Sequence, residues 1–159
     1  MSNQLYLDAE LLENDLRNAI KTQIKKSSIR EDFGDIHLIP LESDFNQDTK
    51  FPAIWLTVTK NGPYLPAQED IEVEPFSRFS VTVETYTSGK NKRSNNMKLA
   101  KLVVYILQLR QQLEHYYNRG LKLDQEIELS SFVTDVNRRV LRFSGVIDNA
   151  SKLILNKEI

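Results

Sequence analysis

Two segments in which apolar and polar residues alternate constrain the fold of this chain most strongly. The apolar positions of one parity are Ile54, Leu56 and Val58 in residues 51–60, and Phe79, Val81 and Val83 in residues 77–87. A period of two is typical of a strand that buries one face, and both segments are rich in β-branched and aromatic residues. The sequence therefore predicts two strands, which we expect to pair as a hairpin with a wide connection.

Two other segments carry the periodicity of helices. Residues 8–26 repeat apolar side chains every three or four positions, with Asp8 as the expected N-cap and Leu7 and Leu12 as a hydrophobic staple. The polar side of this helix is expected to hold Glu13, Arg17, Lys21 and Lys25. A longer helix is predicted from a cap at Ser94 to Arg119, ending at Gly120. Its apolar circumference is wide, so the first helix or a neighbouring subunit should cover its second side.

The remaining patterns complete an α+β domain. Further strands are expected near His37 within residues 36–41, in 121–129, in 138–146 and, at the sheet edge, in 152–155. Residues 135–137 should connect two of these strands. The predicted order is α-β-β-β-α-β-β-(β), a single domain over residues 1–159 with two helices packed on an antiparallel or mixed sheet. Long loops are expected at 42–50 and 61–76.

Composition excludes several classes of protein. The chain has 159 residues, long enough for one core, and its formal charge of −1 argues against a protein whose main role is to coat nucleic acid. No cysteine is present, which removes disulfides and thiolate chemistry. The N-terminus does not resemble a signal peptide, so we expect a cytoplasmic protein. The most apolar stretch, residues 99–109, is too short to span a membrane.

The sequence offers no support for catalysis. His37 and His115 lie at spacings that do not form a metal site, although a two-histidine site across the fold stays open. Nucleotide-binding loops, the serine elbow and the zinc-protease motif are all missing. We therefore expect no catalytic residue, no cofactor and no metal, and a protein that is not an enzyme.

Several residues are instead candidates for contacts with partners. Residues 61–76 form an acidic excursion that contains prolines, which is typical of an exposed binding loop. Lys90, Lys92 and Arg93 precede a predicted helix whose N-terminus favours a phosphate or a carboxylate. Arg138 and Arg142 share one face of a strand, where we favour salt bridges with protein over contacts with nucleic acid. Trp55 and Tyr86 have outward parity, which favours an oligomer. The candidate interface comprises Trp55, Tyr64, Glu69, Asp70, Glu72, Glu74, Tyr86, Lys90, Lys92, Arg93, Arg138 and Arg142.

The order of these elements resembles the tail terminator and tail-completion proteins of long-tailed bacteriophages. The resemblance covers most of the chain and rests on the segments 51–59, 79–90 and 138–145 around a long helix. It implies a ring, usually hexameric, that caps the head-proximal end of the tail tube, stops its polymerisation and joins the head connector. The implied partners are other copies of the chain, the tube protein, the connector, a sheath protein if the tail is contractile, and DNA only as it passes through the channel. The implied place is the neck of the virion, after assembly in the host cytoplasm.

Two alternatives remain open. One is a head-tail connector or stopper, or a tail-tube component. The other is a small ligand-binding or hydrolytic α+β domain, which a strict monomer with a deep apolar pocket at Glu69 or His37 would favour.

Overall fold

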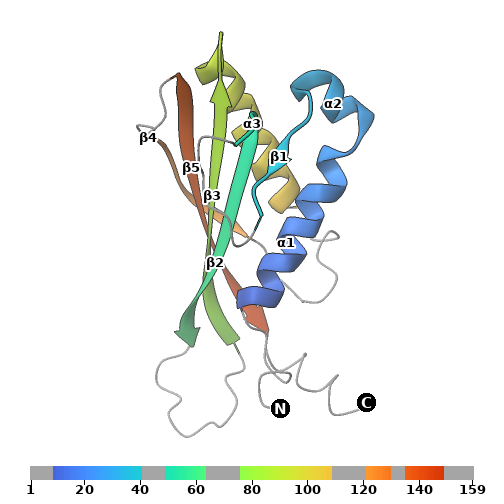
Figure 1. The fold of residues 1–159 in the computed structure, drawn as a ribbon. Coiled ribbons are helices and arrows are strands. Elements are labelled where there is room, and N and C mark those ends of the chain that lie inside the picture. Colours follow the sequence, from blue (N-terminus) through green and yellow to red (C-terminus); the bar gives the residue numbers. More distant parts are fainter. Residues whose placement is uncertain (1–8, 41–48, 64–75, 109–120, 130–134, 149–159) are drawn as a thin grey trace, which may run out of the picture.

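A computed structural model describes residues 9–40, 49–63, 76–108, 121–129 and 135–148 of the chain. Within these residues three helices and five strands form one domain (Figure 1), and the predicted α+β class is confirmed. In chain order the elements are α1 (Ala9–Ile24), α2 (Ser27–Phe33), β1 (His37–Leu38), β2 (Ala53–Pro63), β3 (Phe76–Ser88), α3 (Lys92–Leu107), β4 (Lys122–Leu129) and β5 (Val136–Asp148).

The strands make one mixed sheet in the spatial order β1-β2-β3-β5-β4. The predicted hairpin of β2 and β3 is confirmed, with Leu56 opposite Val83 in antiparallel register. β5 pairs with β3 on the other side and places Leu141 opposite Val83, so the buried parity continues across three strands. β1 is parallel to β2, which makes the sheet mixed.

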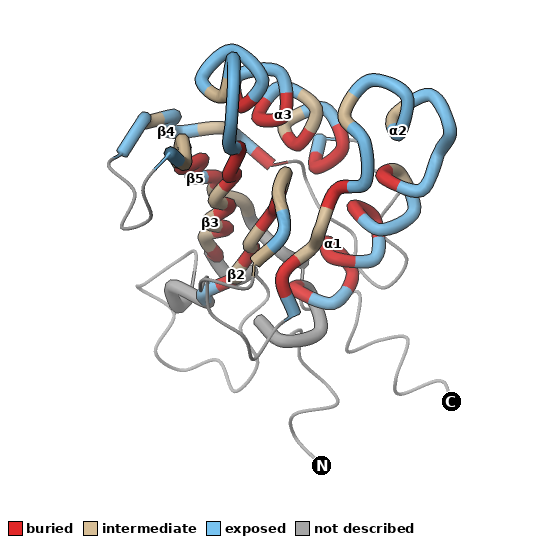
Figure 2. Tube along the Cα trace, turned by 45° about the horizontal axis from the view of Figure 1, so that its top comes forward, coloured by how far each residue is buried: buried red, intermediate tan, exposed pale blue. Residues whose placement is uncertain are grey.

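Helices α1 and α3 cover one face of the sheet, and α1 also contacts α3 (Figures 1 and 2). The main core lies between these layers and includes Leu16 of α1, Val103 of α3 and Phe143 of β5, each at most 1% exposed. The wide apolar surface of the long helix is thus covered within the chain, at least in part. None of the helices in the described part of the chain is long and apolar enough to cross a membrane.

The helices differ in detail from the predictions. A short third helix, α2, follows α1 and was not predicted. α3 starts at Lys92 rather than at Ser94, because Asn91 adopts a left-handed backbone (φ 62°) and takes the N-cap position without a side-chain hydrogen bond. α3 ends at Leu107, and the predicted continuation to Arg119 lies outside the described residues. The expected cap at Asp8 and its staple lie outside them as well.

The expectation that Glu13 and Arg17 lie on the polar side of the first helix is wrong. Each is only 8% exposed. The chain that leaves β1 packs on this side, where Arg17 Nη2 donates a hydrogen bond of 2.7 Å to the Ile39 carbonyl. Burial lowers the pKa of Arg17, and the negative charge of Glu13 opposes this shift.

Two strand boundaries were also wrong. Asn61 to Pro63 were expected to end a strand, but β2 continues through Pro63 with a bulge between Lys60 and Gly62. Val136 and Asn137 were expected in a connection but belong to β5, because the positive φ of Asp135 (65°) makes the turn before them. The loop expected at 61–76 is therefore shorter, because residues 61–63 belong to β2 and residue 76 starts β3. Residues 42–48 and 64–75 lie outside the described part, as does the expected strand 152–155.

Candidate functional site

The sheet face opposite the helices carries a charged cluster of Glu84, Tyr86 and Arg138. Glu84 Oε1 accepts hydrogen bonds from Arg138 Nε at 2.5 Å and from the Tyr86 hydroxyl at 2.7 Å. The period of two along β3 and β5 places these residues on one face, with Tyr86 on the outward parity that the sequence predicted. The Glu84 and Arg138 side chains are 14% and 23% exposed, so water screens their attraction less than at an open surface.

This environment shifts two pKa values. Burial, aided by the hydrogen bond to Glu84, raises the pKa of Tyr86 and keeps its hydroxyl protonated as the donor. The hydrogen bond to Glu84 raises the pKa of Arg138 despite the opposing effect of burial. The expected partner of Arg138 was a carboxylate of another subunit or a DNA phosphate. In the structure its Nε instead contacts a carboxylate of the same chain.

Trp55 and Tyr86 have the predicted outward parity, but the expectation that Tyr86 adds exposed aromatic area is wrong. Tyr86 is 5% exposed and packs with Ile39 and Ala53 in a second, smaller core on this face. Trp55 packs against this cluster and is half-buried. Ile39, the residue that follows β1, therefore packs with Tyr86 and helps to cover it.

Arg142 is the accessible member of the arginine pair. It is exposed, lies on the same face as Arg138, and contacts only Gln125 Oε1 through Nη1 at a long 3.5 Å among the described residues. Its guanidinium remains available to an anionic partner.

Two of the three basic residues at the start of α3 form ion pairs with the β4–β5 hairpin. Lys92 Nζ lies 2.9 Å from Asp135 Oδ1, and Arg93 Nε lies 3.1 Å from Glu128 Oε1. The hydrogen bond from Lys92 lowers the pKa of Asp135. The pKa of Glu128 is lowered chiefly by a hydrogen bond from Asn137, with a further contribution from Arg93. Lys90 is exposed and makes no ion pair within the described residues. The sequence predicted that the three cations form one binding cluster. In the structure Lys92 and Arg93 instead pair with two different carboxylates of the same chain.

Sequence reasoning missed Asn96, which fastens α3 to the sheet. Its side chain is fully buried and its Nδ2 donates to Thr85 O at 3.0 Å, Asn137 O at 3.1 Å and Asn137 Oδ1 at 2.8 Å. A signal was present, because Asn96 precedes Leu99, Ala100 and Val103 by three, four and seven residues and so lies on their buried stripe. Sequence reasoning also did not predict the burial of Arg139, which is 8% exposed. Its Nη1 lies 3.6 Å from Glu126 Oε1.

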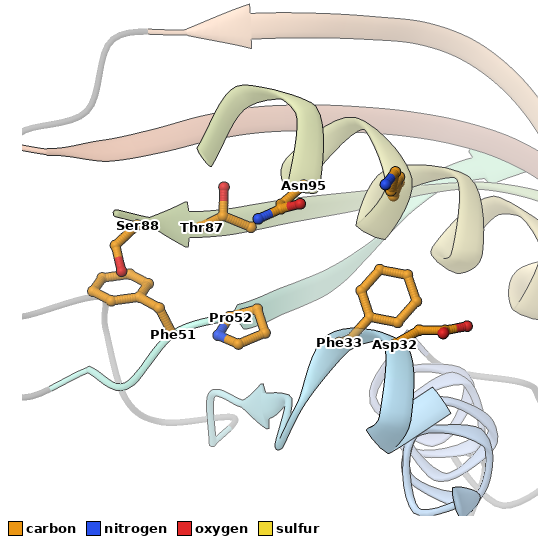
Figure 3. Close-up of a pocket in the computed structure, with 8 residues that line it drawn as sticks. Asp32, Phe33, Phe51, Pro52, Thr87, Ser88 and Asn95 are labelled. Atoms are coloured by element: carbon orange, nitrogen blue, oxygen red, sulfur yellow. The ribbon is translucent and has the colours of Figure 1, made fainter. Parts of the chain in front are cut away.

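A cavity of about 510 Å³ opens where α2, the start of β2, the end of β3 and the first turns of α3 meet (Figure 3). Phe33 points from α2 toward α3, and Phe51 and Pro52 line the opposite part. The polar lining comprises Asp32, Thr87, Ser88, Asn95 and Lys98. His37, one of the two residues at which a deep pocket would have favoured a ligand-binding domain, does not line this cavity, and the other, Glu69, lies outside the described residues.

Other predicted site residues are not placed. Tyr64, Glu69, Asp70, Glu72 and Glu74 lie outside the described residues, and so does His115. Among the described residues, no three His, Asp or Glu side chains gather as metal ligands would.

Comparison with known proteins identifies a shared fold. No protein-family model and no curated protein matches the sequence. A chain in the structure of the virion of native gene transfer agent (GTA) particle is similar, with a TM-score of 0.57 and 11% identity. The similarity covers 84% of this chain and 93% of that chain. At this low identity the comparison shows that the two chains share their fold over nearly the whole length of both.

Proposed function

We propose that this protein is a structural component of a phage-like virion and acts as a tail terminator. The observation that carries the proposal is the fold shared with a chain of the gene transfer agent virion over 93% of that chain. The order of strands and helices that resembles tail terminators in the sequence supports the same role. In this role the protein catalyses no reaction and needs no cofactor.

In this role the protein works as a ring, in which we expect six copies of the chain. The ring caps the head-proximal end of the tail tube, stops its growth and receives the head connector at the neck. Its partners are the tube protein, the connector and, in a contractile tail, the sheath. Arg142 and Trp55 on the helix-free sheet face are candidates for these contacts, because neither is fully covered in one copy.

Controlled polymerisation of the tube protein of the same virion tests the proposal. Tubes grown with the protein present should be shorter and should carry a ring at one end in negative-stain electron microscopy. Tubes of unchanged length without a ring contradict a terminator. Incorporation of the protein along the tube favours a tube component, whereas binding to the head connector with no effect on tubes favours a connector or stopper.

A further inference from the structure

We propose that the exposed face of α3 docks a second copy of the chain, which contributes its acidic segment 64–75. The α3 outer face is defined by residues on one helical stripe: Ser94, Met97, Lys98, Lys101, Tyr105 and Gln108. The inference rests on the proposed function, because a ring requires a contact between copies.

The α3 outer face exposes unusual apolar area. Three large hydrophobic residues of the described chain are exposed, and two of them, Met97 (41%) and Tyr105 (64%), lie on this stripe. The opposite side of α3 is buried against the sheet through residues such as Leu99 and Val103. Tyrosine and methionine are enriched at protein interfaces, where a large apolar body is covered by the partner.

The same face is basic. α3 carries four basic residues and no acidic one. Lys92 and Arg93 pair with Asp135 and Glu128, but Lys98 and Lys101 are exposed and have no ion-pair partner among the described residues. These two lysines flank the apolar side chains one helical turn apart, so the surface that they form suits a partner that is both acidic and apolar.

The chain contains one segment with the complementary chemistry. Residues 64–75 hold four carboxylates, Glu69, Asp70, Glu72 and Glu74, and no basic residue, interleaved with Ile71 and Val73. The formal charge of the whole chain is only −1, so this acidic excess is balanced elsewhere in the sequence. Segment 64–75 of one copy and the α3 outer face of another are thus complementary in charge and in apolar character.

The topology favours a contact between copies over one within a copy. Segment 64–75 joins the ends of β2 and β3 where Pro63 pairs with Ser77, whereas α3 follows Ser88 at the other end of β3. Thirteen residues of strand separate these ends by roughly 40 Å. Lys98 lies near the Ser88 end, since both residues line the cavity described above. Such a head-to-tail contact joins two different surfaces, and repeated rotation closes it into a ring.

Charge exchange tests this contact in the full-length protein. Lys98→Glu with Lys101→Glu and, separately, Glu72→Lys with Glu74→Lys should each weaken self-association about tenfold or more in sedimentation velocity, alone or on tube ends. The two double variants mixed together, or all four changes in one chain, should restore it. Tyr105→Ala should weaken association without changing the charge. The matched control, Lys21→Glu in α1 with Lys25→Glu directly after it, changes two exposed lysines and should have no effect.

Several outcomes overturn the inference. Association that survives either double variant, or that the four changes together do not restore, refutes the contact, provided that far-UV circular dichroism shows folded protein. Tight binding of labelled duplex DNA that the lysine variant abolishes while self-association persists assigns the face to a polyanion instead. If the lysine variant still caps tubes, the inference fails while the proposed function stands. If the wild type neither associates nor caps tubes, both fail.

Discussion

Replacement of Asn96 by alanine tests how α3 is fastened to the sheet. The side chain is fully buried and its amide donates to three acceptors, two of which are the Thr85 and Asn137 carbonyls. A buried carbonyl that loses its donor costs about 1–3 kcal/mol. Part of that loss is offset, because Asn96 Oδ1 is buried without a hydrogen-bond partner among the described residues and its removal relieves a penalty. We therefore expect the free energy of unfolding to fall by about 2–3 kcal/mol.

Urea unfolding followed by far-UV circular dichroism measures this change. With a slope typical of a chain of this size, the midpoint should fall by about 1–2 M while the slope stays constant. Asn95→Ala is the matched control, because Asn95 is exposed on the same turn and should shift the midpoint much less. Equal shifts for the two variants would refute the reasoning that the hydrogen bonds of Asn96, rather than helix propensity, stabilise the α3–sheet contact.

Three further predictions concern pH, arginine pairing and a turn. Since the folded pKa of Tyr86 lies above its unfolded value near 10, stability should fall by about 1 kcal/mol per pH unit above pH 10, and Tyr86→Phe but not Tyr105→Phe should remove part of this slope in urea titrations. Arg138→Ala should lower the free energy of unfolding by about 1–3 kcal/mol by leaving Glu84 with one donor fewer, and Arg142→Ala should lower it less; equal effects would contradict the pairing. Gly89→Ala should lower the free energy of unfolding by about 1–2 kcal/mol, because a side chain strains a backbone with a φ of +80°. No neighbouring atom adds a clash, and an unchanged melting temperature would contradict this prediction.

The sheet was largely predictable because its signal is local. Alternation in residues 54–58 and 79–83 fixes which side chains face the helices, and the structure pairs these segments as expected. Local patterns do not report partners distant in sequence. The burial of Arg17 depends on the Ile39 carbonyl, 22 residues away, and that of Tyr86 on the chain around Ile39 and Ala53. Both residues were therefore misjudged.

The candidate interface was less predictable than the fold for a similar reason. Charge runs identify cations but not their partners, and the ion pairs of Lys92 and Arg93 reach 43 and 35 residues along the chain. Parity placed Arg138 and Arg142 on one face correctly, but only the structure separates a paired arginine from an accessible one. The wide apolar circumference of the long helix predicted a second covering surface, but only the structure shows which of its large side chains stay exposed, Met97 and Tyr105 among them.

Cryo-electron microscopy of the head–tail junction of the intact virion tests the central claim most directly. We predict a ring of this α+β fold at the head-proximal end of the tail tube, between the tube and the connector, with one copy of the chain at each position around the axis. Its absence from the virion, or its presence along the tube or in the capsid instead, would contradict the assignment as a tail terminator.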